Sequence, residues 1–458
     1  MQTLINKLKD DLGDKAVLTG SAISDRYQCD WSNENPLLPV AVLRPASTQE
    51  LSTILKYCHE ADQKVVIQGG LTGLAGGATP QVNEIAITLE RMSGIEELDT
   101  ESMTMTVLAG TPLQKVQEAA HDAGFHFPLD LGARGSCTIG GNVSTNAGGN
   151  QVIRYGMMRN QVLGLEAVLA DGTVVSCMNK MLKNNAGYDL KHLFIGTEGT
   201  LGIVTRIVLR LQPQFPATCT ALCALDNFPD VIKLLQITGQ ELSGSVSSFE
   251  VMWSDYYQFI VDHVESVRSP FEQSFPLYVL LETEGSNQAQ DQERLMTVLS
   301  EAMENALVQD VAMAQSKKDA DMFWAIRDGI GDVTPLLLPM ANFDVSIPIS
   351  RMQPFLEFIT EELRNRFNGI KILIFGHIGD GNLHILATTG SKTDVKEFYD
   401  IVYHTMQTYQ GSVSAEHGIG VIKKDYLPCS RTAEEIKLMR TLKTALDPKG
   451  ILNPGRIV

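Results

Sequence analysis

The chain contains no apolar run long enough to cross a membrane. Its longest apolar stretches, such as residues 334–341, are far shorter than the roughly 20 residues that a spanning helix needs. Residues 1–10 alternate apolar and charged side chains, so they lack the continuous apolar segment of a secretory signal. The length of 458 residues and the 44% hydrophobic content are sufficient for a large core in two or three domains. These features predict a cytoplasmic protein of several domains.

Positive charge and paired cysteines are also scarce. The 37 Lys and Arg residues are outnumbered by 54 Asp and Glu residues, which gives a formal net charge of −17. Such a surface disfavours binding to nucleic acid or to an anionic membrane, and the scattered acidic residues are explained best as a solvated surface. The seven cysteines are dispersed and include no Cys-x-x-Cys pair. This pattern excludes a disulfide framework, a zinc knuckle and an iron–sulfur cluster, and it is typical of a reducing compartment.

Two common nucleotide-binding motifs are absent as well. The chain has neither a Gly-x-Gly-x-x-Gly fingerprint followed by an acidic ribose ligand nor a phosphate loop with Gly-Lys-Ser/Thr. It has instead two other glycine-rich segments, residues 69–77 and 136–149, and a shorter Gly-Thr-Glu-Gly at 196–199. Backbone N–H groups in such segments can surround a pyrophosphate. A tight structural loop would explain either long segment alone, but two in one domain favour ligand binding.

Histidines and a carboxylate gather in two short motifs near the C-terminus. His377 and His384 flank Ile-Gly-Asp-Gly-Asn-Leu, and Glu416 and His417 stand together before Gly-Ile-Gly. Imidazole and carboxylate ligands suit a zinc-like divalent ion, and a histidine beside the carboxylate suits a general base. A satisfied core histidine is the alternative for His384 alone. The glycine-rich surroundings of both motifs favour an open metal site with a proton acceptor at its edge.

The alternation of strands and helices changes near the Pro-Gln-Phe-Pro segment at 213–216. Before it, we expect strands at 41–44, 64–68, 85–89, 103–109, 162–169, 174–177 and 201–211, with helices at 47–61 and 112–123. Asp171-Gly172 predicts a hairpin turn. After it, we expect strands at 219–225, 276–284 and 311–314 and helices at 229–239, 291–307 and 433–446. This second pattern fits a separate α+β domain with an antiparallel sheet.

Six segments of the chain, which include the glycine-rich and histidine motifs, resemble a known family of flavoproteins. The segments at 68–73, 139–149 and 194–202 resemble the FAD-binding domain of the vanillyl-alcohol-oxidase superfamily. The segments at 376–384, 414–420 and 446–456 resemble the C-terminal region of its D-2-hydroxyacid dehydrogenase branch. That branch includes D-lactate dehydrogenases, glycolate oxidase flavoprotein subunits and D-2-hydroxyglutarate dehydrogenases. The resemblance covers nearly the whole chain in the expected order.

The resemblance implies an α+β fold. A two-subdomain FAD-binding domain at 1–213 would precede a cap domain with an antiparallel sheet at 214–425, which would carry the substrate and metal sites. A C-terminal helix and tail at 426–458 would return to the FAD domain. The FAD contacts would be Gly69, Gly70, Thr72, Gly73, Leu74, Asp130, Ser136, Gly140, Gly141, Ser144, Thr145, Asn146, Gly148, Glu198 and Ile203. Non-covalent FAD is expected, because the first loop has Leu71 and no histidine or cysteine, although Cys137 leaves a thioether open.

The resemblance also assigns the catalytic groups. His377, His384 and Glu416 would bind a divalent metal, zinc in the first place and manganese or iron as alternatives. His417 would be the catalytic base, and Asn382 would approach the flavin ring. Arg327 matches the arginine that binds the substrate carboxylate; a surface ion pair with Asp328 or another acidic residue is the alternative. The expected reaction is oxidation of a D-2-hydroxy acid to the 2-oxo acid by hydride transfer to flavin N5.

Two departures from the family bear on the substrate. D-2-hydroxyglutarate dehydrogenases typically have a lysine where this chain has Asn342, and an asparagine where it has Leu386. Both changes remove groups that would hold a second carboxylate, so a D-lactate-like acid is preferred. D-2-hydroxyglutarate and glycolate oxidation, the latter beside an iron–sulfur partner subunit, remain alternatives. So do a non-redox transferase similar to alkyl-dihydroxyacetonephosphate synthase and an inactive flavin-binding subunit.

The partners follow from the same resemblance. Electrons would leave to an external acceptor, which could be an electron-transfer flavoprotein, a quinone or a cytochrome. A homodimer is possible. No nucleic-acid partner and no transmembrane segment are expected.

Overall fold

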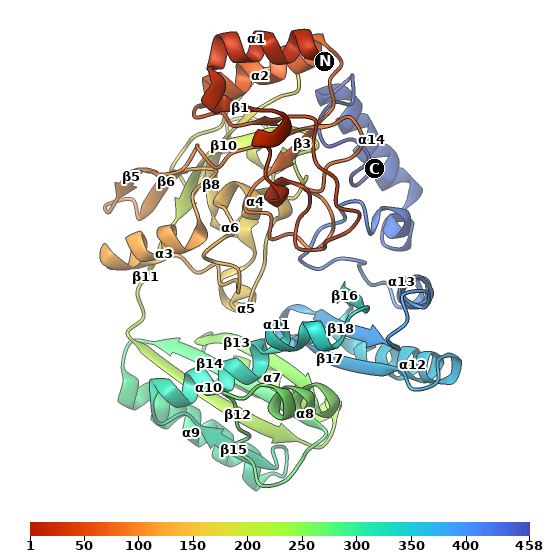
Figure 1. Cartoon of the computed structure of the whole chain (residues 1–458). Helices are drawn as coiled ribbons and strands as arrows, with labels where there is room; N and C mark the ends of the chain where they lie inside the picture. Colours follow the sequence, from red (N-terminus) through yellow and green to blue (C-terminus); the bar gives the residue numbers. More distant parts are fainter. The chain divides into compact units, whose positions relative to one another are not determined.

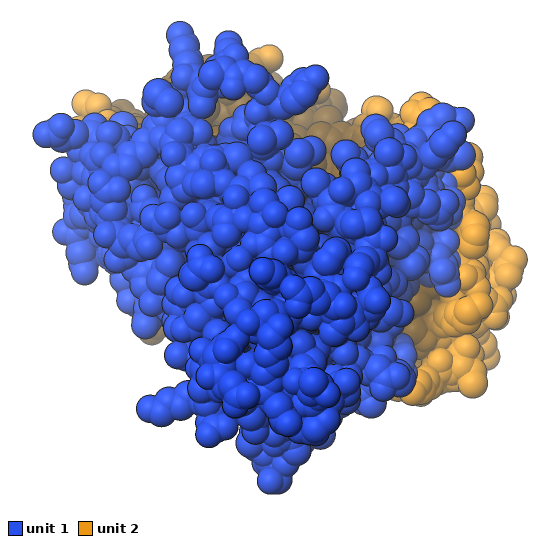
Figure 2. All heavy atoms as spheres, turned by 90° about the horizontal axis from the view of Figure 1, so that it is seen from above, with its two compact units in different colours: residues 1–149, 156–214, 416–458 blue, residues 150–155, 215–415 orange.

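A computed structural model describes all 458 residues, which form two compact units (Figures 1 and 2). Unit 1 comprises residues 1–149, 156–214 and 416–458, and unit 2 comprises residues 150–155 and 215–415. The sequence-based divisions lie at 213/214 and 425/426. The compact units divide at 214/215 and 415/416, and unit 2 also takes in a short helix at 150–155.

Unit 1 contains three sheets. The first has the order β1-β2-β4-β3, with β2, β4 and β3 parallel, and the second is antiparallel with the order β5-β6-β10-β8-β9; β11 pairs with β7. The strands are β1 Val17–Leu18, β2 Val42–Leu43, β3 Val65–Gln68, β4 Ile85–Thr88, β5 Ile95–Asp99, β6 Thr104–Leu108, β7 Phe125–His126, β8 Val162–Val168, β9 Val174–Ser176, β10 Ile203–Arg210 and β11 Gln212–Pro213. The helices are α1 Gln2–Leu12, α2 Thr48–Glu60, α3 Leu113–Asp122, α4 Ile139–Thr145, α6 Met158–Gln161 and α14 Ala433–Leu446.

Local sequence signals explain several of these elements. The Ser47 side chain accepts the N–H of Glu50 and so begins α2, whose buried face includes Leu51 and Leu55. The predicted hairpin between β8 and β9 is confirmed, with Gly172 at φ 88°. The predicted strand at 41–44 is reduced to two residues in β2.

Unit 2 is built on one seven-stranded antiparallel sheet with the order β15-β12-β14-β13-β17-β18-β16 (Figure 1). The strands are β12 Ala217–Leu225, β13 Val246–Trp253, β14 Leu277–Gly285, β15 Asp310–Met313, β16 Ala341–Ser346, β17 Lys371–His377 and β18 Asn382–Thr388. The helices are α5 Val152–Tyr155, α7 Phe228–Glu241, α8 Ser254–His263, α9 Gln288–Glu304, α10 Lys317–Asp328, α11 Ile330–Val333, α12 Ile349–Arg366 and α13 Val395–Thr408. The predicted α+β class and antiparallel sheet are confirmed.

One face of this sheet matters most for the site. Helices α8 and α10 pack on it, and their side chains join strand residues such as Phe375 and Leu386 in one apolar cluster. Arg327, near the C-terminal end of α10, is 5% exposed. The helix therefore carries a buried cation to a face that is otherwise largely apolar.

Candidate functional site

Strand register builds a polar patch at one end of the unit 2 sheet. His377 ends β17 and lies opposite Glu250 of β13, while His384 of β18 lies opposite Asp344 of β16. Phe375 lies opposite His384. Because side chains alternate along a strand, all five face the same side of the sheet. Segments more than a hundred residues apart in the sequence thus supply one site.

Arg327, Glu250 and His377 form a buried trio. Glu250 accepts from Arg327 Nε at 2.8 Å with one carboxylate oxygen and contacts His377 Nδ1 at 2.7 Å with the other. Arg327 Nη2 lies 3.1 Å from His377 Nε2. The side chains of Arg327, Glu250 and His377 are 6%, 1% and 5% exposed, so water screens these contacts little.

The pKa directions in the trio reflect mutual stabilisation of charge. Burial alone would raise the pKa of the Glu250 carboxyl, but the charges of His377 and Arg327 outweigh burial and hold it below its usual value. Burial alone would lower the pKa of Arg327, but Glu250 and then Asp328 raise it. Glu250 therefore stays a carboxylate and Arg327 a cation.

The segment at 412–415 is fixed to β16 before it reaches Glu416. Ser412 and Ser346 exchange backbone hydrogen bonds at 2.7 and 3.1 Å. The Ala415 N–H donates to the Asp344 carbonyl at 3.1 Å, and Ser414 Oγ donates to the Asp344 carboxylate at 3.0 Å. Asp344 is fully buried and thus ties the loop to the strand both by its main chain and by its side chain.

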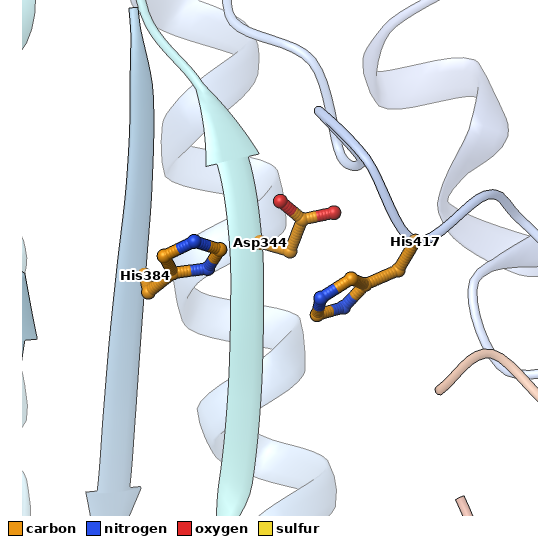
Figure 3. Close-up of side chains that lie close together, drawn as sticks. All are labelled: Asp344, His384 and His417. Atoms are coloured by element: carbon orange, nitrogen blue, oxygen red, sulfur yellow. The ribbon is translucent and has the colours of Figure 1, made fainter. Parts of the chain in front are cut away.

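Two overlapping groups of side chains could hold a metal ion. His377 and His384 of unit 2 each offer one ring nitrogen, and Glu416 of unit 1 offers a carboxylate oxygen. Asp344 and His384 of unit 2 and His417 of unit 1 offer a second set of donors, and Figure 3 labels their side chains. Two nitrogens and a carboxylate oxygen are a donor set that suits a zinc-like ion, so the first group fits the predicted metal triad chemically.

In unit 1, the main chain that follows His417 is bound by Glu198. The Glu198 carboxylate accepts the N–H groups of Ile419 at 2.7 Å and of Gly420 at 2.9 Å. A Cβ on Gly418 would lie 2.6 Å from Glu198 Oε1, and a Cβ on Gly420 would lie 2.0 Å from the carbonyl oxygen of Ala75. Both glycines have positive φ, so glycine is needed here for conformation and for space.

Glu198 is thus engaged by the loop backbone rather than free for a ligand. Removal from water raises the pKa of the Glu198 carboxyl, although the two N–H donors and the charges of Lys423 and Arg456 act in the opposite direction. The predicted FAD contact at this position would have to come from other atoms of the residue. Its φ of 50° marks an unusual backbone conformation at the same point.

The two glycine-rich segments of unit 1 approach each other closely. A Cβ on Gly70 would lie 2.1 Å from the carbonyl oxygen of Ser136, and a Cβ on Gly69 would lie 2.8 Å from Thr138 Oγ1. Leu71 has φ of 60°. The N–H groups of residues 70–74 donate to no protein acceptor. Unpaired main-chain donors in a tight loop fit the pyrophosphate of a dinucleotide.

The remaining predicted FAD contacts also lie in unit 1. Asp130 forms an ion pair with Arg134 at 3.6 Å, and Ile203 is a buried residue at the start of β10. Cys137 is 3% exposed and belongs to the core, and burial raises the pKa of its thiol. The others lie in the second loop and in or beside α4: Ser136, Gly140, Gly141, Ser144, Thr145, Asn146 and Gly148.

Strands β16 and β18 carry three further residues on the same face as His384 and Asp344, namely Leu386, Asn342 and Asn382. Leu386 shares its face of β18 with His384 and is 4% exposed within the apolar cluster, and it lies opposite Asn342. Asn382 donates through Nδ2 to Asp344 at 2.8 Å, while its buried Oδ1 has no protein donor. That oxygen is an open acceptor beside the histidines.

Comparison with known proteins identifies the family. The model of FAD linked oxidases, C-terminal domain, matches residues 215–457, and the FAD binding domain model matches residues 39–178. A probable mitochondrial D-2-hydroxyglutarate dehydrogenase of Oryza sativa subsp. indica is 39% identical over 99% of this chain and 81% of its own length. The chain belongs to the FAD-dependent D-2-hydroxyacid dehydrogenase branch of the vanillyl-alcohol-oxidase superfamily.

Other proteins similar to this dehydrogenase include a putative D-lactate dehydrogenase and a synthase with the same fold. A putative mitochondrial D-lactate dehydrogenase of Schizosaccharomyces pombe is 35% identical over 96% of this chain and 86% of its own length. Among solved structures, an alkyldihydroxyacetonephosphate synthase superimposes with a TM-score of 0.77 at 18% identity. The match covers 99% of this chain and 84% of the synthase chain. That likeness is one of fold alone. The predictions of family, fold class, FAD and an FAD-linked oxidoreductase are confirmed.

Two residues of the candidate site, Glu250 and Asp344, were not given a role from the sequence. Each is the only charged residue of its strand, and a lone buried charge is a signal that could have found both. No helix of the structure has the length and apolar character that crossing a membrane requires.

Proposed function

We propose that this dehydrogenase oxidises a D-2-hydroxy acid with a small uncharged side chain, of which D-lactate is the model, with the help of a divalent metal. The observation that carries the proposal is the shared face of the unit 2 sheet. It places a buried arginine and two histidines beside an apolar position, Leu386. In a D-2-hydroxy acid, the carboxylate would need the arginine, the hydroxyl would need the histidines, and a short alkyl side chain would need the apolar position.

The substrate carboxylate is assigned to Arg327. Its guanidinium is held by Glu250 at 2.8 Å, and its central carbon lies 4.9 Å from the ring centroid of Phe375. A planar cation fixed in this way binds carboxylates with a defined orientation. The alternative ion pair with Asp328 exists at 3.3 Å, but Asp328 is 47% exposed and leaves the buried side of the cation to other partners.

The metal is assigned to His377, His384 and Glu416. A divalent ion bound there would supply Lewis acidity to the α-hydroxyl. His417 is the residue that would receive the hydroxyl proton, since its imidazole is a suitable proton acceptor and directly follows Glu416 in the chain. Zinc suits the donor set first, and manganese or iron would also be accommodated.

The glycine-rich segments of unit 1 would hold FAD, which would supply the hydride acceptor, flavin N5, for the hydrogen on C2 of the substrate. The unpaired N–H groups of residues 70–74 support this placement of the pyrophosphate. The open Oδ1 of Asn382 is a candidate acceptor for the flavin ring or the substrate. Non-covalent attachment is proposed, since Cys137 is packed in the core.

The side chain of the substrate is assigned to the neighbourhood of Leu386. Its apolar cluster favours a methyl group over a second carboxylate, whose burial without a partner is costly. D-2-hydroxyglutarate is the second candidate, because the relative from Oryza sativa carries that substrate in its name. We further propose that electrons pass to an external acceptor, such as an electron-transfer flavoprotein, a quinone or a cytochrome, and that the protein forms a homodimer.

Anaerobic reduction of the FAD-loaded protein tests the proposal. D-lactate, L-lactate, D-2-hydroxyglutarate and glycolate are added in turn while flavin absorbance is followed, with and without a chelator. D-lactate should bleach the flavin fastest, L-lactate should not bleach it, and the chelator should slow the reaction. His417→Asn should slow flavin reduction by about 10²–10⁴-fold. Failure of every D-acid to reduce the flavin overturns the function, and insensitivity to complete metal removal overturns the metal assignment.

A further inference from the structure

The Glu250 carboxylate touches both a proposed substrate anchor, Arg327, and a proposed metal ligand, His377. It lies in β13, at the centre of the seven-stranded sheet, and is 1% exposed. One carboxylate oxygen accepts from Arg327 Nε at 2.8 Å, and the other lies 2.7 Å from His377 Nδ1. Both oxygens are therefore committed, each to a different functional group.

The contact with His377 determines which ring nitrogen is available. A carboxylate can only accept, so Nδ1 of His377 carries the proton of this contact. In the neutral ring that metal binding requires, the lone pair is on Nε2, which faces away from Glu250 and lies 3.1 Å from Arg327 Nη2. A histidine binds a metal through such a lone pair, and a carboxylate on the other nitrogen fixes the ring orientation. Glu250 thus prepares His377 as a ligand through Nε2.

The contact with Arg327 determines the orientation of the guanidinium. Nε is bound by Glu250, and the plane lies near the face of Phe375. The hydroxyl of Tyr256 in α8 donates to the Arg327 carbonyl at 2.6 Å and so holds the C-terminal end of α10. With Nε and the main chain held, the guanidinium has little freedom to turn.

We propose that Glu250 is a shared positioning residue that sets two binding functions together: metal affinity through His377 and substrate-carboxylate affinity through Arg327. This inference rests on the proposed function, because it takes His377 as a ligand and Arg327 as an anchor. A carboxylate that only stabilised the fold would not alter both affinities in a protein that remains folded. A single substitution at Glu250 therefore separates positioning from stability.

The matched control is Glu282, a carboxylate on the neighbouring strand β14. It accepts from Trp324 Nε1 and from Thr220 Oγ1, both at 2.8 Å, and it touches neither Arg327 nor His377 through those bonds. Glu250→Gln and Glu282→Gln each replace a partly or fully buried carboxylate by an amide of the same shape. Only the first should disturb the two proposed binding groups.

The experiment uses full-length, FAD-loaded protein freed of metal by a chelator. Zinc affinity is measured by competition with a chromophoric chelator, and pyruvate affinity by the change in flavin absorbance, with and without zinc. Glu250→Gln should weaken zinc binding by about 10–100-fold, the usual effect of removing the carboxylate behind a metal-bound histidine. It should weaken pyruvate binding by about 10-fold, the size of one lost charge-assisted hydrogen bond. Glu282→Gln should stay close to wild type in both.

A second variant keeps the test decisive if Glu250→Gln folds poorly. Glu250→Asp retains the charge, but its shorter side chain cannot span both partners, so one affinity should recover and the other should not. Folding and FAD content are verified for each variant. An unchanged zinc or pyruvate affinity in folded Glu250→Gln, with normal zinc binding by wild type, overturns this inference alone. Absence of zinc binding by wild type overturns the proposed metal function and this inference with it.

Discussion

The two units each hold a key segment with a glutamate, but the two glutamates act on different partners. Glu250 in unit 2 binds the side chains of Arg327 and His377, and their charges lower its pKa. Glu198 in unit 1 binds two backbone N–H groups, and removal from water raises its pKa. Full opposite charges offset the loss of hydration, whereas peptide dipoles offset it only in part. Unit 2 therefore fixes functional side chains by charge, and unit 1 fixes a functional loop by its main chain.

The largest effect should come from removing the cation of unit 2. Arg327→Leu leaves Glu250 buried without its guanidinium partner, so the free energy of unfolding should fall by about 3–5 kcal/mol. Urea denaturation followed by circular dichroism measures this loss. The control is Arg364→Leu, whose ion pair with Asp255 is 58% and 64% exposed and should contribute less than about 1 kcal/mol. Equal small losses in the two variants would show that charge does not organise this part of unit 2.

A smaller effect is expected from removing the acceptor of unit 1. Glu198→Ala leaves the N–H groups of Ile419 and Gly420 without their acceptor, and a lost partner costs about 1–3 kcal/mol of stability. The turnover rate should fall too, because the same loop carries Glu416 and His417. Glu198→Gln keeps one acceptor oxygen, so its losses of stability and of turnover rate should both be smaller than those of Glu198→Ala. A turnover rate that survives in Glu198→Ala would mean that the loop is held by its other contacts.

The contrast also explains what the sequence could and could not predict. The proposed ligands His377 and His384 could be picked out because both lie in one short motif rich in glycine, and the α+β class followed from the element pattern. Glu250 lies in a strand that was not predicted, and its meeting with His377 depends on the pairing of β13 with β17. Such a pairing joins segments far apart in the chain, and no local signal encodes it. The glycines that follow Glu416 and His417 were interpreted as room for a ligand, but the group beside Gly418 is the Glu198 carboxylate, which comes from a distant loop.

The proposed position of the substrate side chain, beside Leu386, offers a third and smaller test of how unit 2 uses polar groups. Asn342→Lys combined with Leu386→Asn introduces a cation and an amide at paired positions of β16 and β18. The ratio of kcat/KM for D-2-hydroxyglutarate over that for D-lactate should rise by about 10-fold, the size of one new charge-assisted interaction. Steady-state rates with both acids measure the ratio, and Leu386→Met serves as the apolar control. A ratio that does not move would place the substrate side chain away from Leu386.

The smallest expected effect is a difference in pH dependence. The raised pKa of Glu198 means that the folded state holds its proton more tightly than the unfolded state, whose pKa is near 4.5. The stability contributed by Glu198 is therefore complete below pH 4.5 and declines as the pH rises through the folded-state pKa. Glu198→Gln cannot titrate, so wild type should lose stability relative to this variant as the pH rises over that interval.

A carboxylate with the opposite shift provides the control for this titration. The Thr432 N–H lowers the pKa of Glu435 at the start of α14, so its contribution is present above pH 4.5 and is lost as the pH falls through the folded-state pKa. Wild type should thus gain stability relative to Glu435→Gln as the pH rises, the reverse of the comparison with Glu198→Gln. Urea midpoints across the acid range give both slopes. Slopes of the same sign would contradict the raised pKa of Glu198, because only a carboxylate whose loss of hydration exceeds its hydrogen bonding can reverse the sign.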